Sequence, residues 1–486
     1  MQTVIKELKT MQPGPALVKA SGWVRTKRDS KNVCFIEVND GTCLKGLQVV
    51  ADKAVFDNNL LNSISTGCSV VCEGQIVASE GGDQAVELKA TSIEVIGDAP
   101  ADYPLQKKRH TLEYLRDIAH LRARTNTIGA VARVRSKMAF AVHKFFQEND
   151  FYYVNTPLIT ASDCEGAGQM FQVTTLDLAN PPRLEDGRID YSKDFFGKHT
   201  SLTVSGQLEG ETYATALRNI YTFGPTFRAE NSNTKRHLAE FWMVEPEMSF
   251  CTLEGDMEIA ESFLKYVFKY VLEECDEDME FFSKFIEPGV KDTIVHVVET
   301  PFAHMTYTEA VKELEKHGDK FEFKPFWGCD LQTEHERFLT EEVCHRPVIV
   351  TDYPKEIKSF YMKLNDDGKT VRAMDVLAPR LGEIIGGSER EYRYDVLKAR
   401  MAELGLREED YWWYLDLRKY GTVPHSGFGL GFERAVQYVT GMQNIRDVIP
   451  YPRAVKKALS IYNGDCCRIF CDGPFFYAHR GLRVCF

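Results

Sequence analysis

The sequence predicts an α+β protein of at least two domains, with a small β-barrel preceding a larger domain whose sheet is flanked by helices. The chain has 486 residues, which is too long for a single hydrophobic core of ordinary size. Its first hundred residues form short alternating runs broken by turns, whereas the remainder mixes helical and strand periodicities. Hydrophobic residues make up 44% and charged residues 27%, as in globular proteins with buried cores.

The N-terminal segment, residues 1–100, reads as five strands with turn residues such as Asp40-Gly41 between them. The expected strands are 17–25, 33–39, 44–50, 69–77 and 85–95. Five short strands suit an oligonucleotide-binding (OB) barrel, whose open face takes single-stranded bases. There, Phe35 offers a stacking surface, Gln48 a hydrogen bond to a base edge and Arg28 a cation for phosphate. A place for Phe35 in the barrel core is the alternative.

Charge limits the partners of the chain. The formal net charge of −12 argues against a general nucleic-acid binder. A specific contact with phosphate needs only a local basic surface, which a cluster on the first strand and turn offers. The cluster consists of Lys19, Arg25, Lys27, Arg28 and Lys31. A merely solvated strand and turn is the competing interpretation.

Hydropathy and cysteine usage indicate a cytoplasmic protein. No stretch near 18 consecutive apolar residues is present, and Met1–Thr10 lacks the apolar core of a signal peptide. Of the thirteen cysteines, those up to Cys344 are scattered singly, which favours reduced thiols. Cys68 and Cys72 stand in a strand-like run and are expected to be buried structural thiols rather than metal ligands.

Residues 101–120 are expected to link the barrel to a second domain, because two prolines interrupt the pattern around Pro100 and Pro104. That domain, residues 121–457, begins with apolar residues at helical spacing over 126–147. A strand-like segment, 151–160, follows. Irregular alternation beyond it predicts a large sheet with flanking helices.

Two segments of the second domain carry the chemistry. Residues 227–230 and 241–245 are expected to lie on antiparallel strands joined by a polar loop, which would place Arg228, His237 and Phe241 together. Cations and an aromatic face suit a nucleotide triphosphate, whereas a charged surface hairpin is the structural alternative. Residues 426–434 alternate glycines before a helical pattern but lack the Gly-Lys-Ser/Thr ending of a Walker loop.

These segments resemble the class II aminoacyl-tRNA synthetases. Phe227–Glu247 is similar to motif 2 of that family and Gly427–Arg434 to motif 3. The helix ending near Asn149, with Phe151–Leu158 after it, resembles motif 1. The likeness covers residues 1–456 and narrows to the aspartate, asparagine and lysine subgroup. It implies a catalytic domain built on an antiparallel sheet, and a homodimer formed through the motif 1 helix and strand.

The resemblance also implies roles for individual residues. Arg228 would contact the ATP α-phosphate and the transition state, while Arg434 would clamp the nucleotide from the opposite side. The remaining ATP-binding residues would be Glu230, His237, Phe241 and Glu383. Asp375 and Glu383, eight residues apart, look like carboxylates that hold Mg²⁺ with the substrate phosphates; two solvated acids in a loop would be the structural alternative.

Asparagine is the expected amino-acid substrate, with tRNA(Asn) as partner. Aspartate-activating relatives carry a lysine at the position of Gly210, and its loss removes the reason to bind a second carboxylate. Glu245 would accept from a carboxamide and repel aspartate. Arg390 would contact the side-chain oxygen. Gln207 and Glu165 would hold the substrate backbone, in a site closed by the Gly-flanked loop of Glu165.

The sequence is compatible with three alternative functions. They are an aspartate-activating synthetase of relaxed tRNA choice, an asparagine-forming paralogue that needs no tRNA, and a non-catalytic tRNA-binding or regulatory paralogue. Residues 458–486, with four cysteines in the last 21 positions, form an atypical extension. We expect it to be loosely packed and dispensable, so that deletion after Lys457 preserves aminoacylation.

Overall fold

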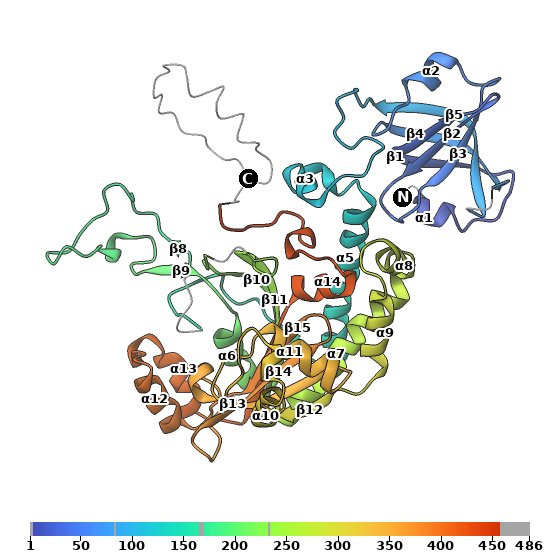
Figure 1. Cartoon of the computed structure of the whole chain (residues 1–486). Helices are drawn as coiled ribbons and strands as arrows, with labels where there is room; N and C mark the ends of the chain where they lie inside the picture. The colour runs from blue at the N-terminus through green and yellow to red at the C-terminus, as the bar shows by residue number, and fades with distance from the viewer. Residues whose placement is uncertain (1–2, 82–83, 165–169, 232–233, 457–486) are drawn as a thin grey trace.

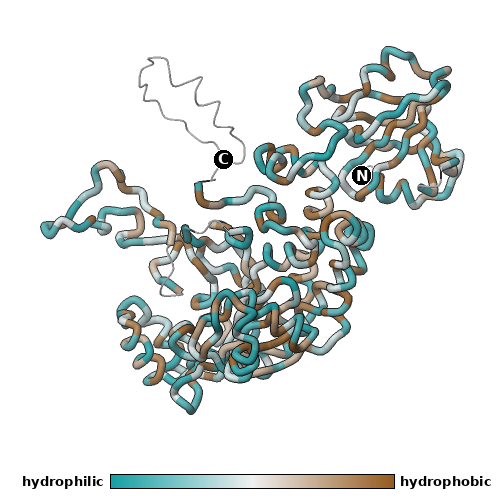
Figure 2. Tube along the Cα trace, viewed as in Figure 1, coloured by the Kyte–Doolittle hydropathy of each residue, from teal (hydrophilic) through white to brown (hydrophobic). Residues whose placement is uncertain are grey.

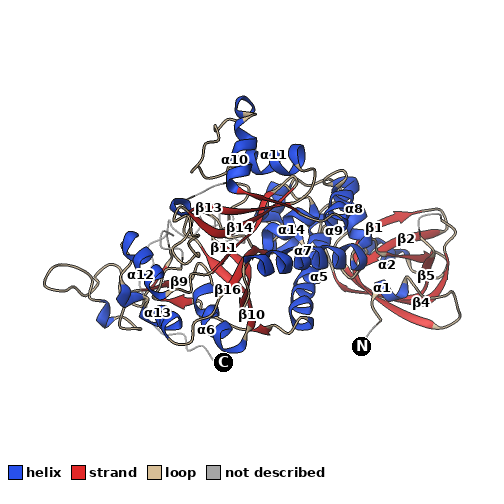
Figure 3. Cartoon of the chain, turned by 90° about the horizontal axis from the view of Figure 1, so that it is seen from below, coloured by secondary structure: helices blue, strands red, loops and turns tan. Residues whose placement is uncertain are grey.

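The computed structural model describes residues 3–81, 84–164, 170–231 and 234–456. Figure 1 shows a barrel of N-terminal strands at one end of the molecule, joined to a larger body through α3 and α5, and Figure 3 shows the same division at right angles. The predicted fold class is therefore confirmed. Within the described residues, no helix combines the length and apolarity needed to cross a membrane. Glu165 and the extension 458–486 lie outside the described residues.

The N-terminal barrel is closed, with strand order β1-β2-β3-β5-β4. Its strands are β1 (Leu17–Asp29), β2 (Val33–Asn39), β3 (Leu47–Asp52), β4 (Ser69–Ala78) and β5 (Val86–Gly97), and short helices α1 (Ile5–Leu8) and α2 (Asn58–Ser63) accompany them. All five predicted strands exist, although β3 begins three residues later than expected. Along β2, Cys34, Ile36 and Val38 enter the core because side chains alternate across a strand.

The predicted thiols Cys68 and Cys72 are also in the barrel core, and neither is exposed. Burial raises the pKa of Cys72 to about 12, so this thiol stays protonated and unreactive. Both are free cysteines, as are the other cysteines of the described ranges. The prediction of buried structural thiols is confirmed.

The larger domain is built on an eight-stranded sheet of order β12-β13-β14-β15-β16-β11-β10-β6. Along the chain, its strands are β6 (Tyr152–Tyr153), β10 (Asn219–Phe227), β11 (Glu240–Ser249), β12 (Ala303–Thr306), β13 (Val348–Pro354), β14 (Thr370–Ala378), β15 (Gly382–Glu389) and β16 (His425–Gly431). Its central pairings are antiparallel, and the β12-β13 and β10-β6 pairs are parallel. A small sheet contains β7 (Ile159–Thr160), β8 (Gln172–Val173) and β9 (Thr200–Leu202).

Helices cover the sheet and the hinge. Those of the hinge and of the largest core are α3 (Leu112–Asp117), α4 (Ala119–Arg122), α5 (Asn126–Glu148), α7 (Leu253–Glu274), α8 (Asp276–Phe285), α9 (Val290–Glu299) and α14 (Phe432–Thr440). The others are α6 (Gln207–Leu217), α10 (Tyr307–Glu315), α11 (Thr333–Phe338), α12 (Tyr394–Glu403) and α13 (Trp412–Lys419). In Figure 2, hydrophobic segments recur inside both domains.

One face of the sheet is core and the other is available for chemistry. On β11, Val244 and Met248 join the large core with α5, α7, α9 and α14. The alternate residues Met243, Glu245 and Glu247 therefore point to the opposite face. That face is where α6 packs on β10 and β11. Alternate side chains of β11 thus pack in the core or face a candidate site.

The expected strand over 151–160 is wrong in extent. Only the two-residue strands β6 and β7 form within it. Pro157 lies between them and has no N–H to donate to a sheet ladder, so the strand is interrupted where the segment crosses from one sheet to the other.

Candidate active site

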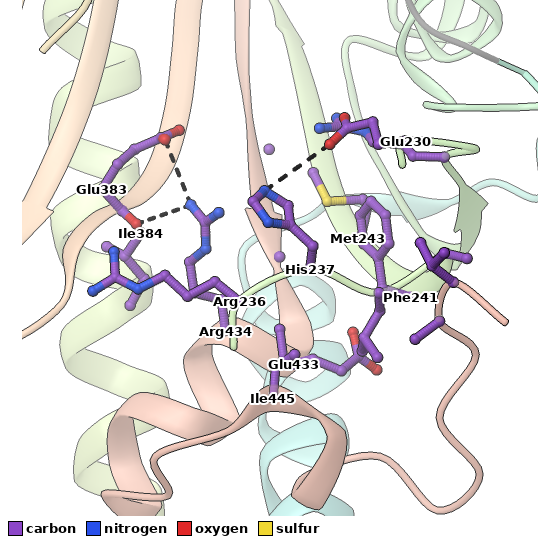
Figure 4. A pocket seen from close by; sticks show the side chains of 17 residues that line it. Glu230, Arg236, His237, Phe241, Met243, Glu383, Ile384, Glu433, Arg434 and Ile445 are labelled. Carbon is purple, nitrogen blue, oxygen red and sulfur yellow. Dashed lines mark hydrogen bonds and ion pairs between the residues drawn. The ribbon is translucent and has the colours of Figure 1, made fainter. Parts of the chain in front are cut away.

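The six side chains predicted to bind a nucleotide line one cavity of ≈ 170 Å³. They are Arg228, Glu230, His237, Phe241, Glu383 and Arg434. The first four come from the β10-β11 hairpin and its loop, Glu383 from β15, and Arg434 from the start of α14. Figure 4 shows labelled side chains from these elements around one space. Segments more than 200 residues apart in sequence are thus brought together.

The hairpin fixes the aromatic and cationic groups of this cavity. β10 and β11 pair antiparallel, with Thr226 opposite Phe241. The Arg228 guanidinium carbon lies 5.4 Å from the centroid of the Phe241 ring, within cation–π range. His237 Nε2 lies 4.0 Å from a carboxylate oxygen of Glu230. A flat ring beside a cation is the arrangement that a purine base and its phosphates require.

Arg434 reaches the cavity from the other side. One of its nitrogens donates to the Glu383 backbone oxygen at 3.0 Å and lies 3.5 Å from a Glu383 carboxylate oxygen. Its neighbour Glu433 is buried and accepts a hydrogen bond from the Trp242 N–H at 2.8 Å, which ties α14 to the hairpin. Glycines 429 and 431 lie on β16, so the glycine-rich segment is a strand that leads directly into α14.

Arg236 is a further lining residue that the sequence interpretation did not single out. It donates to the Thr333 hydroxyl at 2.8 Å. Burial lowers its pKa from the ordinary value, and the positive charge of Arg434 lowers it further. Its position beside His237 in a polar loop was the available signal. This end of the site therefore concentrates positive charge.

Asp375 and Glu383 lie on neighbouring strands, so the alternative that places two acids in a loop is wrong. Asp375 is on β14 opposite Gly386 of β15, and a bulge follows Val376 before Leu377 pairs with Glu383. The bulge absorbs the extra residue and turns both carboxylates to one side. A Cβ on Gly386 would lie 3.1 Å from Glu383 Oε1 and 3.6 Å from Asp375 Oδ1. Glycine thus leaves room for a cation between two hard oxygen ligands.

Lys358 and Glu336 surround this acidic pair. Lys358 donates to both carboxylate oxygens of Asp375, at 2.7 and 2.9 Å. Burial raises the pKa of Asp375, Lys358 opposes that shift, and the charge of Glu383 adds to it. Burial and the neighbouring Glu383 raise the pKa of Glu336 to about 8. Among the described residues, no group of three or more His, Cys, Asp and Glu side chains is placed to hold a metal.

A second cavity, of ≈ 320 Å³, adjoins the first. The two share Arg228, Met243, Glu383 and Gly429 as lining residues. Gln207, Glu245 and Arg390, predicted to bind the amino acid, line the second cavity. Gly210, also predicted to bind the amino acid, does not line this cavity. It lies one turn beyond Gln207 on α6, where an added Cβ would stand 3.3 Å from Ile220 and 3.9 Å from Glu247 Cγ. Because the two cavities share lining residues, a small polar ligand in the second would lie next to a nucleotide in the first.

The polar groups of the second cavity are held by neighbours. Glu245 accepts from the Gly206 N–H and the Thr222 hydroxyl, both at 3.0 Å, and from the Ser205 hydroxyl. Arg390 is 2% exposed, forms a two-point ion pair with Glu247 and donates to Ser388 at 2.8 Å. Burial raises the pKa of Glu247 from its ordinary value, and the two-point ion pair with Arg390 opposes that shift and favours the charged form. The floor of the cavity is thus prearranged.

Glu247 lines this cavity, Glu211, Arg418 and His425 lie behind it, and the sequence interpretation assigned no role to these four residues. Alternation along β11 would have placed Glu247 on the same face as Glu245, so a signal existed. Arg418 and His425 have no such signal, because they reach Glu211 from α13 and β16, over 200 residues away in sequence. The predicted contact of Glu165 lies outside the described residues.

On the barrel, Arg28 and Phe35 are paired in register between β1 and β2. The Arg28 guanidinium carbon lies 4.9 Å from the Phe35 ring centroid. Phe35 is partly exposed on the outer face, so its alternative placement in the core is wrong. Gln48 lies on β3 and its amide donates to Glu87 at 2.9 Å. These groups share an outward face suitable for unstacked bases.

Elements predicted to form a dimer are also present. α5 spans Asn126–Glu148, in close agreement with the expected helix, and β6 follows it. Two large side chains there are more than half exposed: Phe140 at 56% and Tyr152 at 58%. These rings are exposed in the single chain, and the dimer stays a prediction.

Comparisons with known proteins agree with the two-part architecture. Residues 111–455 match the family model for tRNA synthetases class II (D, K and N). Residues 18–96 match the model for an OB-fold nucleic acid binding domain.

Individual relatives extend the likeness over nearly the whole chain. The asparagine–tRNA ligase of Treponema denticola is 64% identical over 468 residues, covering 94% of this chain and 99% of the relative. That of Synechocystis is 63% identical over 443 residues, covering 91% and 96%. Asparaginyl-tRNA synthetase from Pyrococcus horikoshii, solved with asparaginyl-adenylate, is 32% identical with a TM-score of 0.82, covering 94% and 99%.

Proposed function

The chain belongs to the class II tRNA synthetases of the D, K and N group, and we propose that it is an asparagine–tRNA ligase. It activates L-asparagine with ATP and transfers the asparaginyl group to the 3′-terminal adenosine of tRNA(Asn). The observation that carries this function is the pair of joined cavities, in which Arg228 and Glu383 line both. Identity of 60–64% to asparagine–tRNA ligases supports the choice of asparagine.

In the first step, a carboxylate oxygen of asparagine attacks the α-phosphorus of ATP in line with the leaving pyrophosphate. The new bond gives asparaginyl-adenylate, and the α–β phosphoanhydride bond breaks with its electron pair remaining on pyrophosphate. Arg228 lies where the two cavities meet and would neutralise charge on the α-phosphate. Phe241 would stack on the base, with Glu230 and His237 contacting the nucleotide and Arg434 closing the other side.

Asp375 and Glu383 would hold Mg²⁺ together with phosphate oxygens, and the ion would supply further neutralisation of the triphosphate. The shared cavity wall would position the two reactants, which reduces the entropic part of the barrier. No protein nucleophile is needed, because the substrate carboxylate is itself the nucleophile. In the second step, a ribose hydroxyl of tRNA attacks the mixed anhydride and releases AMP.

Asparagine is proposed on the charge of the second cavity. Arg390 would donate to the side-chain oxygen, and Glu245 would accept from the carboxamide NH₂ while repelling a carboxylate. Gly210 leaves that region without the lysine of aspartate-activating relatives. Gln207 and Glu165 would hold the ammonium and backbone groups. The alternative, an aspartate-activating enzyme of relaxed tRNA choice, would need an added cation to balance its second carboxylate.

Further proposals follow from the resemblance. Arg28, Phe35 and Gln48 would bind the anticodon, which argues against the asparagine-forming paralogue that has no anticodon to recognise. We place the enzyme in the cytoplasm as a homodimer built through α5 and β6.

A charging assay tests the function directly. Transcripts carrying the asparagine or the aspartate anticodon would each be incubated with ATP and either amino acid. We expect product only for asparagine with tRNA(Asn). Charging with aspartate would establish the aspartate-activating alternative, and adenylate formation without any charging would contradict the tRNA ligase.

A further inference from the structure

Glu211 is a buried carboxylate behind the amino-acid cavity, with no role yet in the reaction. It lies one helical turn after Gln207 on α6 and is 0% exposed. Its Oε1 accepts from the Tyr414 hydroxyl at 2.9 Å and from the Gln207 amide at 3.1 Å. Its Oε2 accepts from Arg418 at 2.7 Å and lies 2.9 Å from His425 Nε2. Residues from α6, α13 and β16 therefore converge on one charge.

That charge is maintained despite complete burial. Burial alone raises the pKa of Glu211, but Arg418 and His425 reverse the shift and hold the pKa below the ordinary value of a glutamate. Glu211 is consequently ionised at neutral pH. A carboxylate that is buried, charged and supplied with four partners is fixed in position.

Glu211 also acts on the residues that face the substrate. Its hydrogen bond orients the Gln207 amide with the NH₂ group toward Glu211, which leaves the amide oxygen to accept from the substrate ammonium group. Its Oε1 lies 4.0 Å from Arg390 Nε. Arg390 is thus offset by Glu247 on one side and Glu211 on the other.

We propose that Glu211 determines specificity by offsetting the charge of Arg390 and Arg418, so that the cavity binds a neutral carboxamide in preference to a carboxylate. An aspartate side chain at Arg390 would become a third carboxylate beside Glu211 and Glu247, and like charges repel strongly where solvent is excluded. Asparagine adds no charge. Without Glu211, two buried guanidinium groups would lack part of their balance and would attract aspartate.

This inference rests on the proposed function, and the test separates the two. ATP/pyrophosphate exchange would be measured with asparagine and with aspartate for the wild type, Glu211→Gln and Glu211→Asp. For Glu211→Gln, we expect the ratio of kcat/KM for asparagine to that for aspartate to fall about tenfold or more. Glu211→Asp keeps the charge but shortens its reach to Gln207, so the asparagine KM should rise while the preference stays.

Glu391→Gln is the matched control. Glu391 is 1% exposed and its carboxylate also accepts four hydrogen bonds, from Arg393 and from the backbone N–H groups of Arg393 and Leu364. It does not line the amino-acid cavity. Its loss should lower the unfolding midpoint without changing the amino-acid preference.

The outcomes are distinguishable. A wild type that fails to activate asparagine overturns the proposed function itself. A wild type that activates asparagine, beside a Glu211→Gln variant with unchanged preference, overturns only the role of Glu211. If Glu211→Gln shows no exchange, Glu211→Asp decides: retained preference supports the charge role, and lost preference overturns it.

Discussion

The two ends of the active site differ in how their charges are exposed. At the nucleotide end, the side chains of Arg434 and Glu383 are 31% and 42% exposed. At the amino-acid end, those of Arg390 and Glu247 are 3% and 1% exposed, and those of Arg418 and Glu211 are fully buried. One end presents accessible cations to a highly charged ligand. The other holds charges that already balance one another.

This difference shows how one sheet serves two tasks. Binding a triphosphate needs positive groups that can adjust to it, and accessible arginines supply them. Separating two nearly isosteric amino acids needs polarity fixed in advance, because size cannot distinguish them. Burial fixes that polarity by making every unpaired group costly. Substitutions at the nucleotide end should therefore lower the rate of activation, whereas those at the amino-acid end should change the preference between amino acids.

The largest effect is expected at Arg228, where the two ends meet. Arg228→Ala removes the cation assigned to the α-phosphate and should lower asparagine-dependent ATP/pyrophosphate exchange by about 10³-fold. The fold should persist, as judged by circular dichroism and the unfolding midpoint. Arg188→Ala is the control, because Arg188 is 78% exposed and forms a surface pair with Asp186. Exchange near the wild-type rate would refute the assigned role.

The same contrast explains which parts of the site could be predicted from sequence. Arg228, His237 and Phe241 lie within one hairpin, and its geometry follows from two apolar runs and a polar loop. Local pairing alone therefore brings them together. The five barrel strands were also predictable, since alternation and turn residues are local signals.

The amino-acid end could be predicted only in part. Gly210, Glu245 and Arg390 were found by resemblance, but the partners of Glu211 come from α13 and β16 and meet only after tertiary packing. The placement of Asp375 and Glu383 on paired strands depends on a bulge, which their spacing of eight residues does not reveal. Pro157, by contrast, is a local signal that interrupts the strand predicted over 151–160.

Gly210→Lys should give the buried amino-acid end an unbalanced cation, such as the nucleotide end has. Gly210→Lys adds a cation near Glu247 and crowds Ile220, so asparagine kcat/KM should fall about 10²-fold while activation of aspartate gains. Gly210→Ala is the control for crowding alone and should cost far less. Unchanged exchange kinetics with both amino acids would count against this explanation of specificity.

A barrel substitution should leave both ends of the active site intact. Phe35→Ala removes the proposed stacking surface, worth about 1–3 kcal/mol per base, and should raise the KM for tRNA by about tenfold or more. Asparagine-dependent exchange without tRNA should not change. As the control, Phe323→Ala removes an exposed ring, 58% exposed, from the other domain. Equal effects of the two variants on charging would argue against anticodon contact by Phe35.

The smallest effect is a pH dependence of stability that belongs to the buried end. Arg418 and His425 overcome burial and lower the pKa of Glu211 in the folded protein. The unfolded chain therefore binds the proton more readily, with a pKa of about 4.3. The stabilisation that Glu211 contributes is then complete above that pH and is lost as the pH falls through the lower folded value.

Urea unfolding of the wild type and Glu211→Gln measures this contribution. Charged hydrogen bonds of this kind contribute about 1.5–3 kcal/mol, so the variant should be less stable by that order at pH 7. The difference between the two proteins should shrink at progressively lower pH, below about 4.3. A constant difference would mean that Glu211 stabilises through shape rather than charge. Because the exposed carboxylates at the nucleotide end are common to both proteins, their titration cancels in the difference.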